Sequence, residues 1–271
     1  MPCCTTHPTL RKKNPYLCYP THHTPQHMAL PYTDIALPGI PPYRLMHVPG
    51  GEFLMGANEQ DEDALDREKP AHRVRLDDFY IGRFPVTQDL WASVMGENPA
   101  MVKGLRCPVE NVSWNEITHK FLPRLNKLTG HKCRLPTESE WEYSTRSGTF
   151  IEEDCFRFAS SDILEQVGWY DPNSGYAPRE VGLLLPNALG LYDMSGNVWE
   201  WCADWYQRDY YSNCEKLGVV HNPLGPDEGS YRVLRGGSWA SLIESCRVSS
   251  RNSNIPIHRR IDYSFRIALV P

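Results

Sequence analysis

Two short segments in the C-terminal third concentrate tryptophan, glycine and carboxylate residues. Gly190–Trp201 reads GLYDMSGNVWEW, and Arg235–Trp239 reads RGGSW. Glycines so placed allow positive φ angles or close backbone approach, and tryptophans require large buried surfaces. The pattern predicts a modest core closed by irregular, glycine-containing loops rather than by long regular elements.

Composition narrows the class of protein. The chain has 271 residues, of which 41% are hydrophobic and 23% charged, with 23 prolines and a net charge of -5. These values are typical of a globular domain and give no reason to expect nucleic-acid binding. No apolar run is long enough to span a membrane, and no signal peptide is visible, so a cytoplasmic location is the default. We expect a monomer.

Nine cysteines stand at positions 3, 4, 18, 107, 133, 155, 202, 214 and 246. Beyond the adjacent first pair, no two are close enough for a Cys-x-x-Cys metal or redox site. Their low density and odd number favour a mostly reduced set, and one or two long-range disulfides stay open.

The chain divides into two parts. Residues 1–42 hold nine prolines with little periodicity and are expected to be a disordered or poorly ordered extension. Residues 43–271 are expected to form one α+β domain with much coil. No internal repeat is apparent.

Local patterns predict the elements of that domain. Alternation over 72–81 predicts one half-buried strand, and residues 265–270 predict a closing strand. Thr87 is the expected N-cap of a helix ending at Met95. A second helix is expected over 115–128 with a distortion at Pro123, and Thr137 with Glu140 predicts a capping box.

Several motifs in order carry a family resemblance. They are GGEFLMG at 50–56, PVT at 85–87, PVENVSW at 108–114, RLPTE at 134–138, the two segments described first, and FRI at 265–267. This series resembles the formylglycine-generating enzyme family, also called the sulfatase-modifying-factor family, from about Tyr43 to Val270. The resemblance implies a loop-rich fold related to the C-type lectins.

The resemblance also implies a calcium site. It places Asp193 and Glu200 as side-chain ligands and Gly196 and Val198 as carbonyl ligands, and hard oxygen donors on such a turn suit Ca²⁺. In the alternative, Asp193 and Asn197 satisfy turn amides and Glu200 pairs with an arginine. The resemblance further assigns Ser238 to a pocket, with Trp199 beside it.

The enzymes of this family oxidise a sulfatase cysteine to formylglycine with O₂ and Cu(I), which a pair of thiolates binds. Here the second thiolate position is Cys246, but the first is Ser241. A serine hydroxyl cannot replace a thiolate toward Cu(I), so Cu(I) is not expected. Cys202 or Cys214 would have to fold close to complete the pair.

Residues 239–264 interleave apolar and aromatic residues with arginines, a pattern that suits a recognition surface. In the alternative, the arginines pair with carboxylates and the isoleucines are buried. The stretch is similar to the variable region of lectin-like proteins diversified by retroelements, although Ser264 replaces the family's usual glycine. The sequence therefore predicts a non-catalytic member that binds a protein or small-molecule ligand; the alternative is the sulfatase-modifying oxidoreductase. Expected contacts are Trp239, Ser241, Leu242, Ile243, Ser245, Ile255, Ile257, Ile261 and Tyr263.

Overall fold

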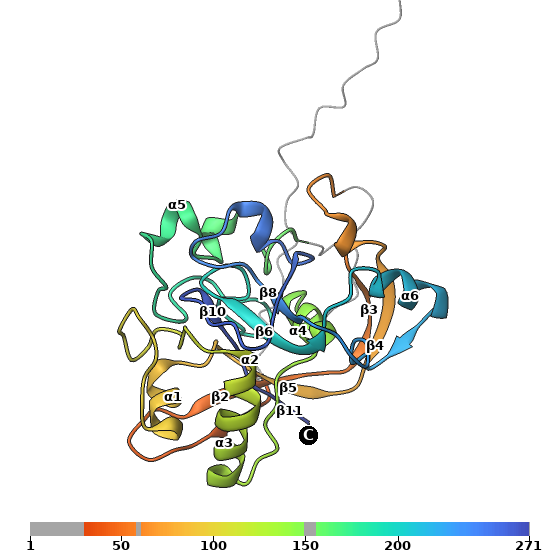
Figure 1. The fold of residues 1–271 in the computed structure, drawn as a ribbon. Coiled ribbons are helices and arrows are strands. Elements are labelled where there is room, and N and C mark those ends of the chain that lie inside the picture. Colours follow the sequence, from red (N-terminus) through yellow and green to blue (C-terminus); the bar gives the residue numbers. More distant parts are fainter. Residues whose placement is uncertain (1–29, 58–60, 149–155, 271) are drawn as a thin grey trace, which may run out of the picture.

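The computed structural model describes residues 30–57, 61–148 and 156–270 (Figure 1). Its α-helices are α1 (Gln88–Met95), α2 (Trp114–Glu116), α3 (Leu122–Thr129), α4 (Glu138–Thr145), α5 (Asp171–Ser174) and α6 (Tyr210–Leu217). Its strands are β1 (Tyr32–Ile35), β2 (Tyr43–Val48), β3 (Gly51–Met55), β4 (His72–Leu76), β5 (Phe79–Gly82), β6 (Trp199–Trp205), β7 (Val220–His221), β8 (Arg232–Arg235), β9 (Arg251–Asn254), β10 (Tyr263–Ser264) and β11 (Ala268–Leu269).

These strands form three small sheets, ordered β1-β2-β5-β11, β10-β6-β8-β9 and β3-β4-β7. Neighbours are antiparallel except in the β6–β10 and β4–β7 pairs. In Figure 1 the sheet that contains β6 and β8 occupies the middle of the molecule, with α1 and α3 below it and α5 above. No helix in the described ranges is both long and apolar enough to cross a bilayer.

Strand β1 lies within the stretch 1–42 that was expected to be poorly ordered. It pairs with β2 along its length, Ile35 enters the core, and Asp34 pairs with Arg44. Pro31 and Pro38 flank the strand instead of interrupting it, so proline density misled the prediction for these residues. Residues 1–29 lie outside the described part of the chain.

The single strand expected over 72–81 is in fact two strands in different sheets. The alternation continues through β4 and β5, but Asp77 and Asp78 separate them. Asp78 accepts the Gly50 N–H, and Asp77 accepts hydrogen bonds from Asn222 and His221. These contacts turn the chain at a point where periodicity alone predicts continuity.

The helix predictions are largely confirmed. Helix α1 follows Thr87, and α4 begins with the expected capping box of Thr137 and Glu140. The helix expected over 115–128 is α2 and α3 joined by a π-helical turn at Ile117–Phe121. Pro123 lies in the first turn of α3, where its missing N–H costs little.

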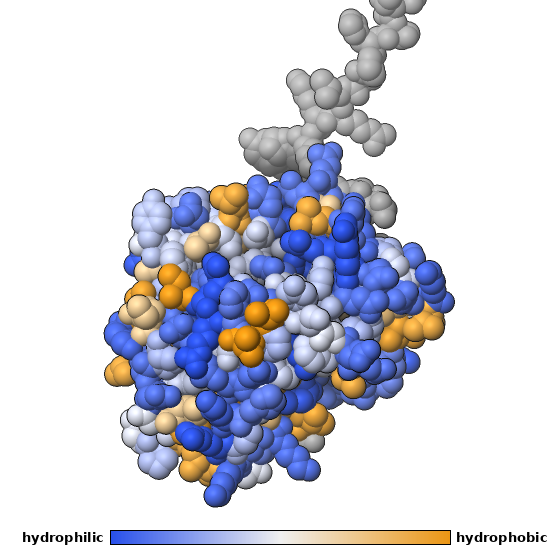
Figure 2. Space-filling view, viewed as in Figure 1, coloured by the Kyte–Doolittle hydropathy of each residue, from blue (hydrophilic) through white to orange (hydrophobic). Residues whose placement is uncertain are grey.

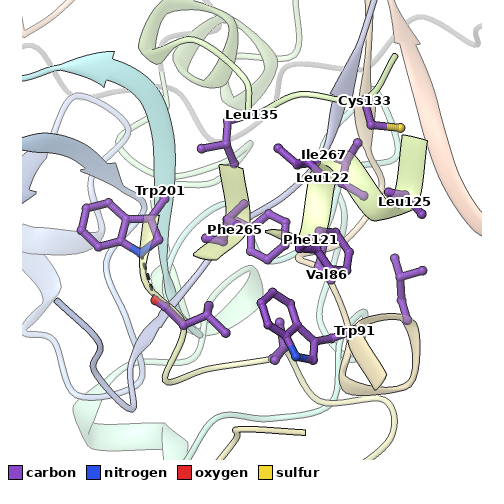
Figure 3. Close-up of a cluster of buried hydrophobic side chains, with 14 of the residues drawn as sticks. Val86, Trp91, Phe121, Leu122, Leu125, Cys133, Leu135, Trp201, Phe265 and Ile267 are labelled. Atoms are coloured by element: carbon purple, nitrogen blue, oxygen red, sulfur yellow. Dashed lines mark hydrogen bonds between the residues drawn. The ribbon is translucent and has the colours of Figure 1, made fainter. Parts of the chain in front are cut away.

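An aromatic cluster forms the core under α1 and α3 (Figure 3). Trp91 stacks on Phe121 with ring centroids 4.9 Å apart, and the edge of Phe265 meets both rings. Trp201 donates its indole N–H to the Val112 carbonyl oxygen at 3.3 Å. A buried aromatic in each of α1, β6 and the last segment thus anchors the loops between them.

Candidate functional site

Four arginine–glutamate pairs are buried beneath the surface of the C-terminal part of the chain, which supplies all four arginines. We call these pairs the buried ion-pair layer. The pairs are Arg235–Glu142, Arg247–Glu68, Arg251–Glu138 and Arg266–Glu200. Each guanidinium is almost completely excluded from solvent. Charges buried this way require partners with complete hydrogen bonding, so the layer fixes the relative positions of distant segments.

Arg235 shows how the layer positions the segment after Cys246. Its guanidinium pairs with Glu142 of α4 and also donates to the carbonyl oxygens of Val248 and Ser249, at 3.1 and 2.8 Å. Arg251, two residues beyond Ser249, binds both Glu138 oxygens at 2.6 and 2.8 Å. The chain entering β9 is therefore held by charge-assisted bonds from both sides.

The two dense sequence segments pack against each other. The Gly196 N–H donates to the Gly236 carbonyl at 2.7 Å, and the Trp239 N–H donates to the Asn197 carbonyl at 2.8 Å. Gly237 has a φ of +77°, and a Cβ there would stand 2.6 Å from the Cys246 sulfur. Glycine is thus required at position 237 by both backbone angle and space.

Ser238, Ser241 and Asp262 form a small polar network beside this turn. The Ser241 hydroxyl accepts the Ser238 N–H at 3.0 Å and lies 3.1 Å from the Ser238 hydroxyl. Ser238 in turn donates to Asp262 at 3.3 Å, and Arg260 donates to the other Asp262 oxygen at 2.9 Å. Ser241 is thus held as a hydrogen-bonding residue within a satisfied network.

Cys246 is 0% exposed and packs in an apolar cluster with Phe158 and Val167. Burial raises the pKa of its thiol to about 12. Its sulfur lies 3.8 Å from the Leu242 carbonyl oxygen, the geometry of a weak S–H donor. A thiol in this environment stays protonated and is a poor nucleophile or metal ligand at neutral pH.

Among the residues that the structure describes, which exclude Cys155, no second thiol shares that cluster. Cys202 is buried in a separate core with Trp141, and Cys214 lies on α6; burial raises the pKa of both thiols. All five cysteines of the described residues are free, including these two. A Cu(I) site of paired thiolates therefore does not fit the residues around Cys246.

The side chains expected to bind calcium already have protein partners. Glu200 accepts two hydrogen bonds from Arg266, each at 2.6 Å, and one from the Trp141 indole at 2.8 Å. Asp193 accepts the Gly182 N–H at 2.9 Å and the Asn197 amide at 3.2 Å, and burial raises its pKa to about 6.

This geometry does not fit Ca²⁺ at Asp193, Gly196, Val198 and Glu200, because a cation beside Glu200 would face the Arg266 guanidinium. It matches the alternative in which the carboxylates serve turn amides and an arginine. Nor do the described ranges contain any cluster of three His, Cys, Asp or Glu side chains able to hold a metal ion.

Several expected contact residues reach the surface. Leu242, Ile257 and Ile261 are 66%, 67% and 45% exposed. The remaining partly exposed members are Trp239, Ser241, Ile243, Ser245 and Ile255. We call Trp239, Leu242, Ile257 and Ile261 the contact face.

The contact face comes from two loops held together at one point. The Trp239 indole N–H donates to the Ile261 carbonyl oxygen at 3.2 Å. The loop 255–261 is fastened next to α2 by the Asn115 N–H, which donates to the Pro256 carbonyl, and by the Arg259–Glu116 pair. Figure 2 shows small hydrophobic spots on this face of the molecule, separated by hydrophilic side chains.

Four residues lie deeper than their predicted roles require. Tyr263 is only 5% exposed and meets the edge of Trp201, so it supports the contact face from below. Ile243 packs against the cluster around Cys246. Trp199 is buried in the aromatic core, and Ser238 is buried in the polar network.

A cavity of about 640 Å³ lies away from the contact face, between α3 and the end of the chain. Its wall includes Trp114, Leu122, Cys133, Leu224 and Val270. No expected contact residue lines it. It is an apolar space that the sequence did not indicate.

Sequence reasoning left open that Glu200 and the C-terminal arginines form ion pairs, but it identified neither the partners in the buried ion-pair layer nor Asp262. Arg266 follows Phe265 in a family motif, and Glu138 and Glu142 lie in the acidic start of α4. Those signals mark the residues but not their partners, because each pair joins positions at least 66 residues apart in sequence.

Comparison with known proteins agrees with this architecture. The model of the sulfatase-modifying factor enzyme 1-like domain family matches residues 41–270, and the chain belongs to this family. The expected loop-rich α+β fold of the formylglycine-generating-enzyme type is confirmed.

Three similar proteins show the kinds of protein in which related domains occur. The formylglycine-generating enzyme of Streptomyces coelicolor is 31% identical, over 82% of this chain and 88% of its own. The serine/threonine-protein kinase Pkn1 of Chlamydia trachomatis is 30% identical over 83% of this chain, which spans only 38% of that kinase. The solved structure of Treponema denticola variable protein 1 is 28% identical, covers 89% of this chain and 99% of its own, and has a TM-score of 0.78.

Proposed function

We propose that this chain is a non-catalytic binding member of its family, with the contact face as its recognition surface. The proposal depends on the two residues at the family's thiolate positions. Ser241 is a hydrogen-bonded serine, and Cys246 is fully buried with a raised thiol pKa. In the described part of the chain, no second thiol stands beside Cys246 to form the thiolate pair expected of the family's enzymes. Binding is the role that the preserved scaffold can still serve.

The contact face supports this role through its composition. Apolar side chains at Leu242, Ile257 and Ile261 stand beside the exposed cations Arg259 and Arg260. An apolar centre with a polar rim is typical of protein interfaces. The likeness to a variable protein of Treponema denticola adds to the proposal, because that protein shares the fold over nearly its whole length.

Selection of peptide ligands from a displayed random library tests the proposal. The selected peptides should lose binding to a triple variant of Leu242, Ile257 and Ile261 to serine. The matched control changes Leu105, Leu185 and Leu217 to serine, because these leucines are comparably exposed elsewhere. Equal loss in both variants, or peptides that bind the cavity beside α3, would contradict the proposal.

The second candidate function is oxidation of a sulfatase cysteine to formylglycine. It is favoured by 31% identity to the Streptomyces enzyme over 88% of that enzyme's length. It requires a second thiolate beside Cys246, and the described cysteines do not supply one.

A further inference from the structure

A small pocket lies where the start of β2, the turn after β5 and the start of α1 meet, at the lower left of Figure 1. It holds about 280 Å³ and is separate from the contact face. Its wall combines an apolar side of Pro41, Pro42 and Leu90 with three arginines, Arg44, Arg83 and Arg106.

The three arginines differ in how well their charges are matched. Arg44 forms a two-bond pair with Asp34 at 2.9 and 3.0 Å. Arg83 and Arg106 have no carboxylate within ion-pair distance among the described residues. The nearby acid Asp89 is engaged by the Thr87 hydroxyl and by the Leu90 N–H, and it does not line the pocket.

Phe84 orders the two unmatched guanidinium groups. Arg83 lies 5.3 Å and Arg106 lies 5.6 Å from the centre of its ring. Cation–π contacts of this kind hold a guanidinium in place without neutralising it. The ring itself is fixed at its backbone, because the Tyr43 hydroxyl donates to the Phe84 carbonyl at 2.6 Å.

Arg83 also has one N–H group without a hydrogen-bond acceptor among the described residues. One terminal nitrogen reaches the Tyr192 hydroxyl at 3.3 Å, while its Nε–H is buried without an acceptor in the described structure. A buried donor without an acceptor is destabilising unless a ligand or water supplies one. The Nε–H itself is closed to solvent, so an anion in this pocket would bind the terminal guanidinium nitrogens of Arg83 and Arg106 and match two charges at once.

We propose that this pocket binds a small organic oxyanion, a phosphate monoester or a carboxylate, between Arg83 and Arg106. Guanidinium groups bind both kinds of oxyanion with paired hydrogen bonds. The apolar wall of Pro41, Pro42 and Leu90 suits a compact apolar body attached to the charged group. This site is independent of the contact face.

Isothermal titration of the full chain with phenyl phosphate, benzoate and inorganic phosphate tests the proposal. We expect saturable binding that weakens with added salt. Tighter binding of phenyl phosphate would assign the site to phosphate monoesters, and tighter binding of benzoate would assign it to carboxylates. Arg106→Gln should weaken the better probe by about tenfold or more, since a charged hydrogen bond is lost.

Arg106 is the first position to change, because its side chain makes no hydrogen bond in the described structure and the fold does not depend on it. Arg83→Lys is the second variant: it keeps the charge, and we expect partial loss. Arg124→Gln is the control, because Arg124 is exposed on α3 and contacts only the Met95 sulfur. The absence of saturable binding of all three probes, or unchanged binding in Arg106→Gln, would overturn the proposal.

Discussion

The buried ion-pair layer and the contact face adjoin in the C-terminal part of the chain but use charge in opposite ways. Arg247, Arg251 and Arg266 are buried and each binds a glutamate from a distant element. Arg259 and Arg260, only a few residues away in sequence, are exposed, and their pairs with Glu116 and Asp262 lie at the surface.

The difference separates the parts of the segment that specify the fold from the parts that are free to vary. A buried arginine cannot lose its partner without leaving an uncompensated charge. An exposed residue of the contact face can change with little effect on folding. Along this segment, residues on which the fold depends therefore alternate with residues that can be replaced at little cost in stability.

The largest expected effect comes from breaking one pair of the buried layer. Arg266→Leu leaves Glu200 charged and without its main partner, so we expect a loss of about 3–5 kcal/mol in the free energy of unfolding. Urea denaturation followed by circular dichroism measures it. A loss below about 1 kcal/mol would mean that the layer does not hold the segment.

Gly237→Ala tests the tight turn above Cys246. Both backbone strain and a Cβ at 2.6 Å from the Cys246 sulfur oppose it, so we expect a loss of about 2 kcal/mol or more. Gly96→Ala is the matched control, since Gly96 has a similar φ of +79° in the left-handed α region with no atom near a Cβ. Equal losses in the two variants would show that contact with Cys246 is unimportant.

Asp204 lies beside the buried layer, and burial together with the charge of Glu138 raises its pKa from 3.8 to about 8. The folded state therefore keeps this proton over a pH range where the unfolded state releases it, so its contribution to stability falls as pH rises through that range. Asp204→Asn should be more favourable, relative to the native chain, at about pH 8 than at about pH 5. Thermal unfolding at both pH values measures the difference, and a pH-independent difference would contradict the raised pKa.

A substitution in the contact face should change stability least among the variants. Ile257→Ser alters a side chain that is 67% exposed, so we expect a change within about 0.5 kcal/mol. The same urea experiment checks it. A loss comparable to that of Arg266→Leu would remove the distinction between the two regions.

Calcium provides the smallest expected effect. Because Arg266 occupies both Glu200 oxygens, neither added Ca²⁺ nor a chelator should shift the melting temperature. Differential scanning fluorimetry with and without chelator measures this. A calcium-dependent rise would restore the site predicted at Asp193, Gly196, Val198 and Glu200.

Much of the fold follows from local sequence patterns. The capping box at Thr137 and the helix after Thr87 depend on neighbouring residues, and the structure contains both. The π-helical turn before α3 and the division at Asp77 depend on tertiary contacts, which periodicity does not contain.

The predictions for the candidate site succeeded and failed for the same reasons as those for the fold. The exposure of Leu242, Ile257 and Ile261 was predicted from their interleaving with arginines, whereas the burial of Tyr263 was not. Tyr263 alternates like a surface residue, but β10 pairs with β6 and brings it to Trp201. The partners of the buried arginines were beyond reach, because they are remote in sequence.

The central claim is that the chain lacks the thiolate pair of its enzymatic relatives. Titration of the reduced native protein with Cu(I), beside a Ser241→Cys variant, tests it most directly, followed by oxidation of a cysteine-containing peptide. We predict that the native chain neither binds Cu(I) tightly nor oxidises the peptide, because Cys246 is buried and the described residues place no second thiol beside it. Tight Cu(I) binding and turnover by the native chain would contradict the claim.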